Sequence, residues 1–394
     1  MKGAVTILQT SLSKRNSGIE VLKILAIVLI VTSHVVQTVG TKGNAYISFS
    51  DYWVELTAAT RKVPVLLLAM LRYSGELGNT IFFVCSAWFL LEKDRVDKKK
   101  ILTILLDIWL VSVTILLIVL LLRHGQLDIR LILFSLFPTL FENNWYLTLY
   151  LIFYALHPAL NLVVRRFERK SLFRLVFFGV LLYFVICFVN RLNNSLFDKG
   201  ATFFVSRLIV WAIIYLLLGY LKTYAGGFLD SRRSGLVMLV VGFVGYYGLV
   251  PLTNLLGLQF AAFKKSLMLW YVPYNPFLLL LVLGLFVLFK GWVFHSRVIN
   301  YVSGLSLYIY IIHENILLRW LYRPAIWRYI HNTYGYHHIV LWVLVLVLAI
   351  FAFGALAAIL YRETLHRLVV LASGKIYPFF SDKWRKMENR LFSR

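Results

Sequence analysis

Residues 19–40 read IEVLKILAIVLIVTSHVVQTVG, an apolar run that follows a basic segment of the chain. A helix needs about 20 apolar residues to cross the hydrocarbon core of a bilayer. Runs of similar length recur along nearly the whole sequence, so this stretch predicts a membrane-spanning fold. No small-residue cleavage site follows the run, which argues against a removed signal peptide.

The composition of the 394-residue chain leads to the same class of protein. Hydrophobic residues make up 60% and charged residues 15%, whereas soluble domains contain about 45–50% and about 25%. This balance excludes a set of soluble domains. The two cysteines, Cys85 and Cys187, lie inside apolar runs, so the sequence gives no basis for a disulfide framework.

We therefore expect an all-α, polytopic transmembrane bundle of about ten spans. The segment near 127–141 is expected to be an interfacial or re-entrant helix, because its apolar part, 131–141, is short and contains Pro138. A crossing there would also break the alternation of charge between successive loops. The expected spans are 19–40, 64–91, 101–122, 145–164, 173–190, 202–221, 235–252, 276–292, 298–318 and 338–361.

The distribution of Lys and Arg predicts the orientation of these spans. Of the 41 Lys and Arg residues, 27 fall in one set of alternate loops and termini, which are therefore expected to be cytoplasmic, with both termini inside. The net charge of +24 is then explained by topology in the plasma membrane, and no nucleic-acid partner is expected. Residues 1–370 form the expected membrane domain, and 371–394 a basic amphipathic tail on anionic cytoplasmic lipid. The aromatic-rich loops 41–63, 253–275 and 319–337 are expected outside.

Polar residues inside the first span point to function, because an intramembrane charge is costly unless it is paired or hydrated. Lys23 and His34 are eleven residues apart, which places them on one helix face about 16 Å apart along the axis. Glu20 lies three residues before Lys23, close enough to pair with it. A neutral imidazole can act as a base. The alternative is that Lys23 snorkels to headgroups and His34 bonds a neighbouring helix.

Two residues in the 298–318 span lie at the same depth as His34. His313 and Glu314 are fifteen and sixteen residues into that outward-running span, so we expect the three groups to meet. Arg72 and Glu76 form an i,i+4 pair in the second span, which is typical of structural pairing.

Asn144 and Trp145 open the 145–164 span from the outside. Interfacial aromatic residues are usually belt anchors, and the alternative is a contact with substrate.

The run Lys98, Lys99, Lys100 is either a positive-inside anchor or a binding site for donor phosphates. Phosphate-loop, dinucleotide, nucleophile-elbow and Cys-x-x-Cys motifs do not occur in the sequence. His337 and His338 stand without further ligands nearby, so we expect no metal.

Four stretches together resemble the membrane-bound acyltransferase-3 family. RNSGIEVLKILAIVLIVTSH (15–34) resembles its N-terminal signature, in which an acidic residue, a basic residue three later and a histidine open the first helix. Three further stretches resemble later family helices in the same order: GNTIFFVCSAWFLL (78–91), NNWYLTLYLIFYALHPALN (143–161) and SGLSLYIYIIHEN (303–315). The family's basic residue is usually Arg, and here Lys23 keeps the charge but not the bidentate geometry. Ala87 stands where the family usually has Gly.

The resemblance implies an O-acyltransferase that moves an acetyl or other short acyl group from a cytosolic acyl-coenzyme A. The implied acceptor is a hydroxyl of an exported or lipid-linked glycan. In this interpretation His34 is the general base, with acyl-histidine formation as a variant. A transporter or flippase of a glycan lipid is the alternative, and a non-catalytic scaffold is a third. In the acyltransferase interpretation Glu20 and Glu314 are catalytic residues with His34: Glu20 would orient or charge-balance the cytoplasmic end, and Glu314 would assist near the acceptor. Lys23 with Lys98–Lys100 would bind donor phosphates, and Asn144, Trp145 and His313 would contact the acceptor.

Overall fold

The described part of the chain is almost entirely helical. The computed structural model describes residues 15–39, 41–42, 45–46, 62–123, 125–139, 144–192, 200–248, 275–335 and 338–392. Within these ranges the strands are β1 (Thr41–Lys42) and β2 (Ala45–Tyr46), which form a two-residue antiparallel pair. The all-α prediction is thus confirmed. Loop 253–274, His337 and most of 41–63 lie outside the described residues.

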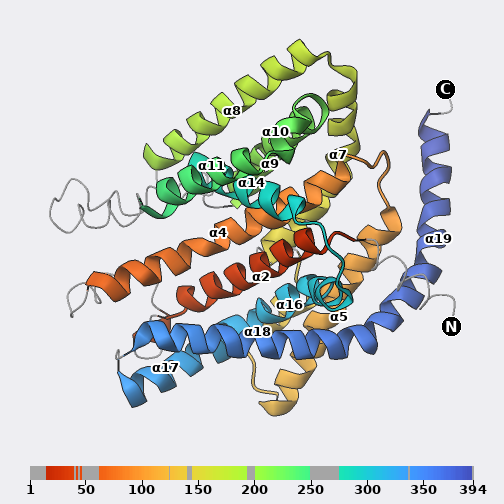
Figure 1. Ribbon diagram of the computed structural model, residues 1–394. Helices are drawn as coiled ribbons and strands as arrows, with labels where there is room; N and C mark the ends of the chain where they lie inside the picture. The colour runs from red at the N-terminus through yellow and green to blue at the C-terminus, as the bar shows by residue number, and fades with distance from the viewer. Residues whose placement is uncertain are drawn as a thin grey trace.

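Long helices run through the molecule side by side (Figure 1). The long helices are α2 (Ser17–Gln37), α4 (Lys62–Leu90), α5 (Lys98–Leu122), α7 (Trp145–Arg166), α8 (Arg169–Leu192), α9 (Gly200–Tyr224), α14 (Pro276–Gly291), α18 (Ile339–Glu363) and α19 (Leu365–Phe392). The shorter elements are α6 (Ile129–Leu136), α10 (Gly226–Asp230), α11 (Arg232–Phe243), α15 (Arg297–Ser303), α16 (Ser306–His313), α17 (Arg323–Tyr334) and the π-helical turns η2 (Val244–Gly248) and η4 (Leu318–Tyr322).

Several helices begin where the sequence supplies a side-chain cap. The side chain of Asn16 accepts a hydrogen bond from the backbone N–H of Gly18 at the start of α2. Asp97 does the same for Lys100 at the start of α5, and Asn275 for α14. Such caps satisfy backbone donors that the first turn of a helix leaves open. The basic run Lys98–Lys100 therefore forms the first turn of α5.

Within the described residues, five helical segments are long and apolar enough to cross a membrane: α2, α5, α7, Phe203–Tyr224 of α9, and α18. The chain is therefore a multi-pass membrane protein by the length and composition of its helices. The total of about ten spans and the N-in, C-in orientation stay predictions. Helix α6, within the segment expected to be interfacial or re-entrant, is eight residues long.

The segment expected as one span over 298–318 is interrupted. Helix α15 ends before Gly304, and α16 ends at His313, after which the chain turns at Glu314 and Asn315. The side chain of Asn315 accepts from the N–H of Leu317 and restarts the helix. Periodicity could not reveal these breaks, because the segment is apolar on both sides of each. The turn at Glu314 places its side chain away from a regular helix surface.

Helix α2 lies in the core of the bundle between α4 and α18 (Figure 1). It approaches α4 closely: a Cβ added at Gly78 would lie 2.5 Å from the carbonyl oxygen of Ala26. Ser33 donates to the carbonyl of Arg72 at 2.6 Å, and Ser74 to that of Leu29 at 2.8 Å. Glycine and hydroxyl side chains thus fix the register of α2 against α4.

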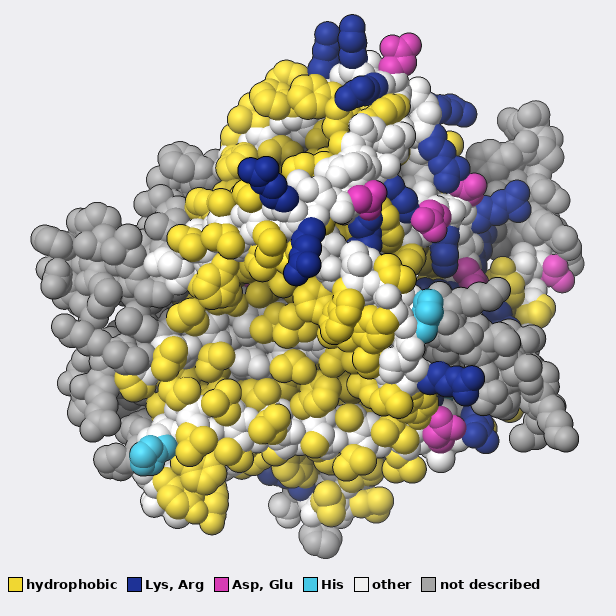
Figure 2. Space-filling model, in the orientation of Figure 1, with side chains coloured by type: hydrophobic (Ala, Val, Ile, Leu, Met, Phe, Trp, Pro, Cys, Tyr) yellow, Lys and Arg dark blue, Asp and Glu magenta, His cyan; other side chains and the backbone are white. Residues whose placement is uncertain are grey.

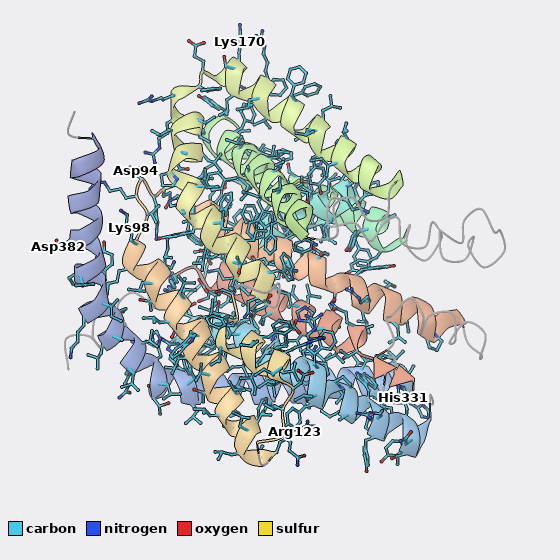
Figure 3. All side chains as sticks on the ribbon, turned by 180° about the vertical axis from the view of Figure 1, so that it is seen from behind. Asp94, Lys98, Arg123, Lys170, His331 and Asp382 are labelled. Carbon is cyan, nitrogen blue, oxygen red and sulfur yellow. The ribbon has the colours of Figure 1, made fainter. Side chains whose placement is uncertain are left out.

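One end of the bundle carries the groups that the charge distribution assigned to the cytoplasm. Lys222 pairs with Glu92 at 2.7 Å, and Arg165 pairs with Asp94. Figure 3 shows Asp94 and Lys98 on one side of the molecule, with His331 on the opposite side. Figure 2 shows a broad hydrophobic area on one face, with Lys and Arg gathered toward its upper and right parts. Lys98, Arg165 and Lys222 of the sequence-predicted set therefore lie toward one end of the described bundle, whereas the side of the membrane that this end faces stays a prediction.

Helix α19 begins immediately after α18 and continues through the expected tail boundary at 370/371. Its first turn is bonded to α5 through a buried carboxylate: His366 Nδ1 lies 2.9 Å and the hydroxyl of Tyr361 2.7 Å from Asp107 Oδ1. The last helix is thereby attached to the element that carries Lys98–Lys100.

Candidate functional site

The three groups expected to meet do so. His34, on α2, has its Nδ1 atom 2.9 Å from Nε2 of His313 and 3.0 Å from Oε1 of Glu314. His313 ends α16, and Glu314 occupies the turn that follows it. His313 and Glu314 are buried, while 12% of the His34 side chain is exposed. The matching depth of the two spans was therefore a sound guide to this contact.

The hydrogen bonds determine which imidazole nitrogens carry protons in the neutral rings. Nδ1 of His313 lies 2.8 Å from the carbonyl oxygen of Ile309, and because a carbonyl only accepts, this Nδ1 is the donor. Nε2 of His313 is then an acceptor. Nδ1 of His34 faces this acceptor and the Glu314 carboxylate, so it is protonated as well. The unprotonated nitrogen of His34 is therefore Nε2, the form required of a general base.

Two arginines hold the Glu314 carboxylate in place. Arg323, whose side chain is 5% exposed, reaches Oε1 with both terminal nitrogens at 3.1 Å. Arg319 reaches Oε2 at 3.4 Å. A buried carboxylate needs such partners, since an unpaired charge would be strongly destabilising. Glu314 is thus fixed in the position that orients the His34 ring.

Side chains of α17 also satisfy the backbone at the end of α2. Arg323 NH1 donates to the carbonyl of His34 at 3.2 Å, and Trp327 Nε1 to that of Val35 at 3.3 Å. His331 Nε2 donates to the carbonyl of Val39 at 2.7 Å. The last carbonyls of a helix lack intrahelical partners, and apolar surroundings offer none. The hydroxyl of Thr38 also reaches the carbonyls of His34 and Val35, and the i, i+4, i+8 stripe on α17 adds donors to these two and to the carbonyl of Val39.

A polar pocket of about 370 Å³ opens beside His34. Trp145, one of the predicted acceptor residues, forms part of its wall. Asn144 does not line it: its amide nitrogen bonds the carbonyl of Pro138 at 3.2 Å. The described lining residues are Ser33, His34, Gln37, Arg72, Gly75, Glu76, Asn79, Trp145, Phe203, Arg207, Glu314, Arg319 and Trp320.

The pocket contains an ion pair that the sequence did not predict. Arg207, on α9, reaches both oxygens of Glu76 at 3.2 and 3.4 Å. Its guanidinium lies 4.5 Å from the ring centroid of Trp145 and 4.3 Å from that of Phe203. Spacing within one helix suggested Arg72 as the partner of Glu76. The available signal for Arg207 was a charged residue inside an apolar span, near the start of α9.

Glu20, Lys23 and the lysine run lie at the opposite end of α2 from His34. Glu20 is buried and accepts from Lys23 Nζ at 3.1 Å and from the hydroxyl of Ser303 at 2.5 Å. The fourteen residues from Glu20 to His34 correspond to about 21 Å of helix. Glu20 therefore does not touch the His34 cluster, and its position suits charge balance. Lys98–Lys100 are exposed, with Lys100 Nζ 5.2 Å from the Tyr154 ring.

His34, His313 and Glu314 also have side chains of the kinds that commonly bind metal ions. One ligand atom from each lies within 4.8 Å of the others. However, both carboxylate oxygens are already bonded by Arg319 and Arg323, and two guanidinium groups oppose a further cation. The donor set therefore suits proton transfer better than metal binding.

A multi-pass helical bundle with a carboxylate-oriented histidine beside a polar pocket fits the class of membrane proteins that transfer protons, which includes both enzymes and transporters. The comparison with protein families identifies the class further: a family described as an acyltransferase domain matches residues 16–374. The chain belongs to this acyltransferase-3 family and is a membrane acyltransferase. No curated protein and no solved structure matches the chain significantly.

Proposed function

We propose that this acyltransferase moves an acetyl or other short acyl group from a cytosolic acyl-coenzyme A to a hydroxyl of an exported or lipid-linked polysaccharide at the plasma membrane. The observation that carries the proposal is the bond of His34 Nδ1 to Glu314 at 3.0 Å. This bond leaves Nε2 of His34 as the unprotonated nitrogen, and His34 lines the pocket. Such a base is what attack by a hydroxyl on a thioester requires.

The proposed reaction begins when Nε2 of His34 takes the proton of the acceptor hydroxyl. The oxygen attacks the thioester carbonyl and forms a tetrahedral intermediate. The carbon–sulfur bond then breaks, and the imidazolium returns its proton to the departing thiolate of coenzyme A. Glu314 stabilises the transient imidazolium, while Arg319 and Arg323 keep the carboxylate in place. An acyl group carried on His34 is the variant of this scheme.

The donor is proposed to enter from the end that carries Lys23. The cation of Lys23 is about 16 Å from His34 along α2, so an extended donor would bind its phosphates there and present its thioester near the pocket. Lys98, Lys99 and Lys100 add positive charge at the same end. Donor and acceptor would then approach His34 from opposite ends of the bundle.

Transfer of radiolabelled acetyl from acetyl-coenzyme A to surface glycan tests the proposal. Membranes with the wild-type chain should label glycan, whereas His34→Ala and His34→Gln should be folded and inactive, since a general base contributes about 10²–10⁴-fold to the rate. Gln keeps the approximate size and hydrogen bonding but cannot accept the proton. An active His34→Gln variant would exclude His34 as the base and leave His313 or Glu314 as alternatives. No transfer by the wild-type chain to any glycan would favour a transporter.

A further inference from the structure

The pocket beside His34 contains more cationic than anionic side chains among the described residues. Arg72, Arg207 and Arg319 line it together with Glu76 and Glu314. Arg323 lies behind Glu314 and adds a fourth guanidinium group. Charges within a membrane bundle are stable when opposite charges face them. The described charges of this pocket therefore favour an occupant that is negatively charged.

Arg207 has a fixed structural role in the pocket wall. It bonds both oxygens of Glu76 and is packed against the rings of Trp145 and Phe203. Arg323 is similarly fixed, by Glu314 and by backbone carbonyls. Stacked and bidentate arginines of this kind are rigid. The positive charges of Arg207 and Arg323 contribute to the electrostatic potential in the pocket. Binding of an anion does not require either arginine to leave its present hydrogen-bond partners.

Arg319 is placed differently. Its side chain is 31% exposed, compared with 5% for Arg323, and its bond to Glu314 is longer, at 3.4 Å. It belongs to the π-helical turn η4, and π-helical turns occur frequently at functional sites. Trp320 of the same turn also lines the pocket. A partly exposed guanidinium such as that of Arg319 can meet a carboxylate or phosphate with paired hydrogen bonds.

Pocket residues of α2 and α4 supply further polar contacts. Arg72 NH1 lies 3.2 Å from the hydroxyl of Ser33, one residue before the base. The side-chain oxygen of Asn79 is buried and has no hydrogen-bond partner among the described residues, although its residue lines the pocket. Buried polar atoms normally have a partner. A sugar hydroxyl would provide one for Asn79.

We infer that the acceptor carries an anionic group, a carboxylate or a phosphate on the sugar, which Arg319 and Arg72 bind while a hydroxyl lies against His34. The inference rests on the proposed function in taking this pocket as the acceptor site. It narrows the acceptor to acidic glycans. Neutral sugars of the same shape are then poor substrates.

Labelling of arginine with phenylglyoxal tests this binding without requiring turnover. The full chain, purified in detergent, is modified in the presence of methyl glucuronide, glucose 6-phosphate, methyl glucoside or coenzyme A at equal ionic strength, and each arginine is quantified by mass spectrometry. We expect one or both anionic probes to protect Arg319 severalfold, and the neutral glucoside not to. Comparison of the two anions distinguishes carboxylate from phosphate. Arg165 and Arg367, exposed arginines outside the pocket, serve as controls.

Three results would overturn the inference. Equal protection by methyl glucoside would show recognition of the sugar ring alone. Absence of protection by every probe would show that Arg319 binds no acceptor anion. Stronger protection by coenzyme A would assign the pocket to the donor. Protection by an anionic probe in a protein without transferase activity would instead contradict the proposed function and leave the anion site intact.

Acceptor kinetics give an independent readout. Arg319→Gln should lower kcat/KM for methyl glucuronide relative to methyl glucoside about tenfold or more, since a charged hydrogen bond contributes about 1.5–3 kcal/mol. Arg319→Lys should keep part of the preference, because it keeps the charge but not the fork. Arg367→Gln, a surface variant, should leave the preference unchanged. An unaltered preference in Arg319→Gln would contradict the role of Arg319.

Discussion

At the scale of single residues, the bond between Glu314 and His34 has a measurable signature. Glu314→Gln removes the charge that stabilises the imidazolium, so we expect kcat to fall about 10²-fold or more. In a His34→Ala background the same substitution should cost no further rate, because the two residues act as one unit. Single-turnover transfer with purified protein measures both effects.

The control for Glu314→Gln is Glu363→Gln, which alters an exposed carboxylate paired with Arg367. Exposed pairs of this kind contribute about 0–1 kcal/mol, so this variant should retain activity. Full additivity of Glu314→Gln and His34→Ala would mean that the two side chains act independently.

Lys23 allows a second test at the same scale. If its ammonium binds donor phosphate, Lys23→Ala should weaken coenzyme A binding about tenfold or more, and Lys23→Arg should retain or improve it. Lys170→Ala, which changes an exposed lysine in the first turn of α8 (Figure 3), is the matched control. Unchanged affinity for coenzyme A in Lys23→Ala would show that Lys23 does not bind the donor, and would support the alternative that it reaches the lipid headgroups.

At the scale of helices, the close contact of α2 and α4 should be sensitive to a single methyl group. A Cβ at Gly78 would lie 2.5 Å from a backbone oxygen of α2, which cannot move as a side-chain end does. Gly78→Ala should therefore destabilise the protein by about 1–3 kcal/mol and displace His34. Gly227→Ala, where nothing lies within 4 Å, should be neutral. Thermal unfolding followed by size-exclusion chromatography compares the two, and equal stability would contradict the tight-packing account.

Individual helices were predictable where a single apolar run has a capping residue, as α2, α5 and α14 do. The interruption at Glu314 was not, because the residues on both sides are apolar and only Asn315 indicates a restart. The segment 319–337 was expected to be a loop, whereas Arg323–Tyr334 form α17, on which Arg323, Trp327 and His331 are spaced i, i+4, i+8. The contact of α17 with α2 could not be predicted either, because the spacing of residues within one helix carries no information about which other helix they contact.

At the scale of the whole molecule, the topology prediction can be tested by cysteine accessibility. In a background with Cys85 and Cys187 replaced by Ser, Lys98→Cys and Asp382→Cys should react with an impermeant maleimide only after permeabilisation. Asn332→Cys should react in intact cells. The expectation follows from the excess of Lys and Arg at one end of the chain's spans. A cysteine at position 98 that reacts only from outside would reverse the orientation and the donor assignment with it.

Much of the site could be predicted from the sequence, by comparing how deep the polar and charged residues lie in their spans. The meeting of His34 with His313 and Glu314 followed from equal depth in two spans. Arg207, Arg319 and Arg323 were missed, since each lies on a different element and only the folded bundle shows that they surround the same two carboxylates.

The attachment of α17 to α2 also has a consequence for biogenesis. The carbonyls at the end of α2 are bonded by side chains that are synthesised about three hundred residues later. Chains are made from the N-terminus, so the first helix enters the membrane before these donors exist. The bonds from α17 to the His34 end of α2 therefore form only after most of the last third of the protein has been made, and a ribosome-stalled chain that ends before α17 lacks Arg323, which holds the Glu314 carboxylate beside His34.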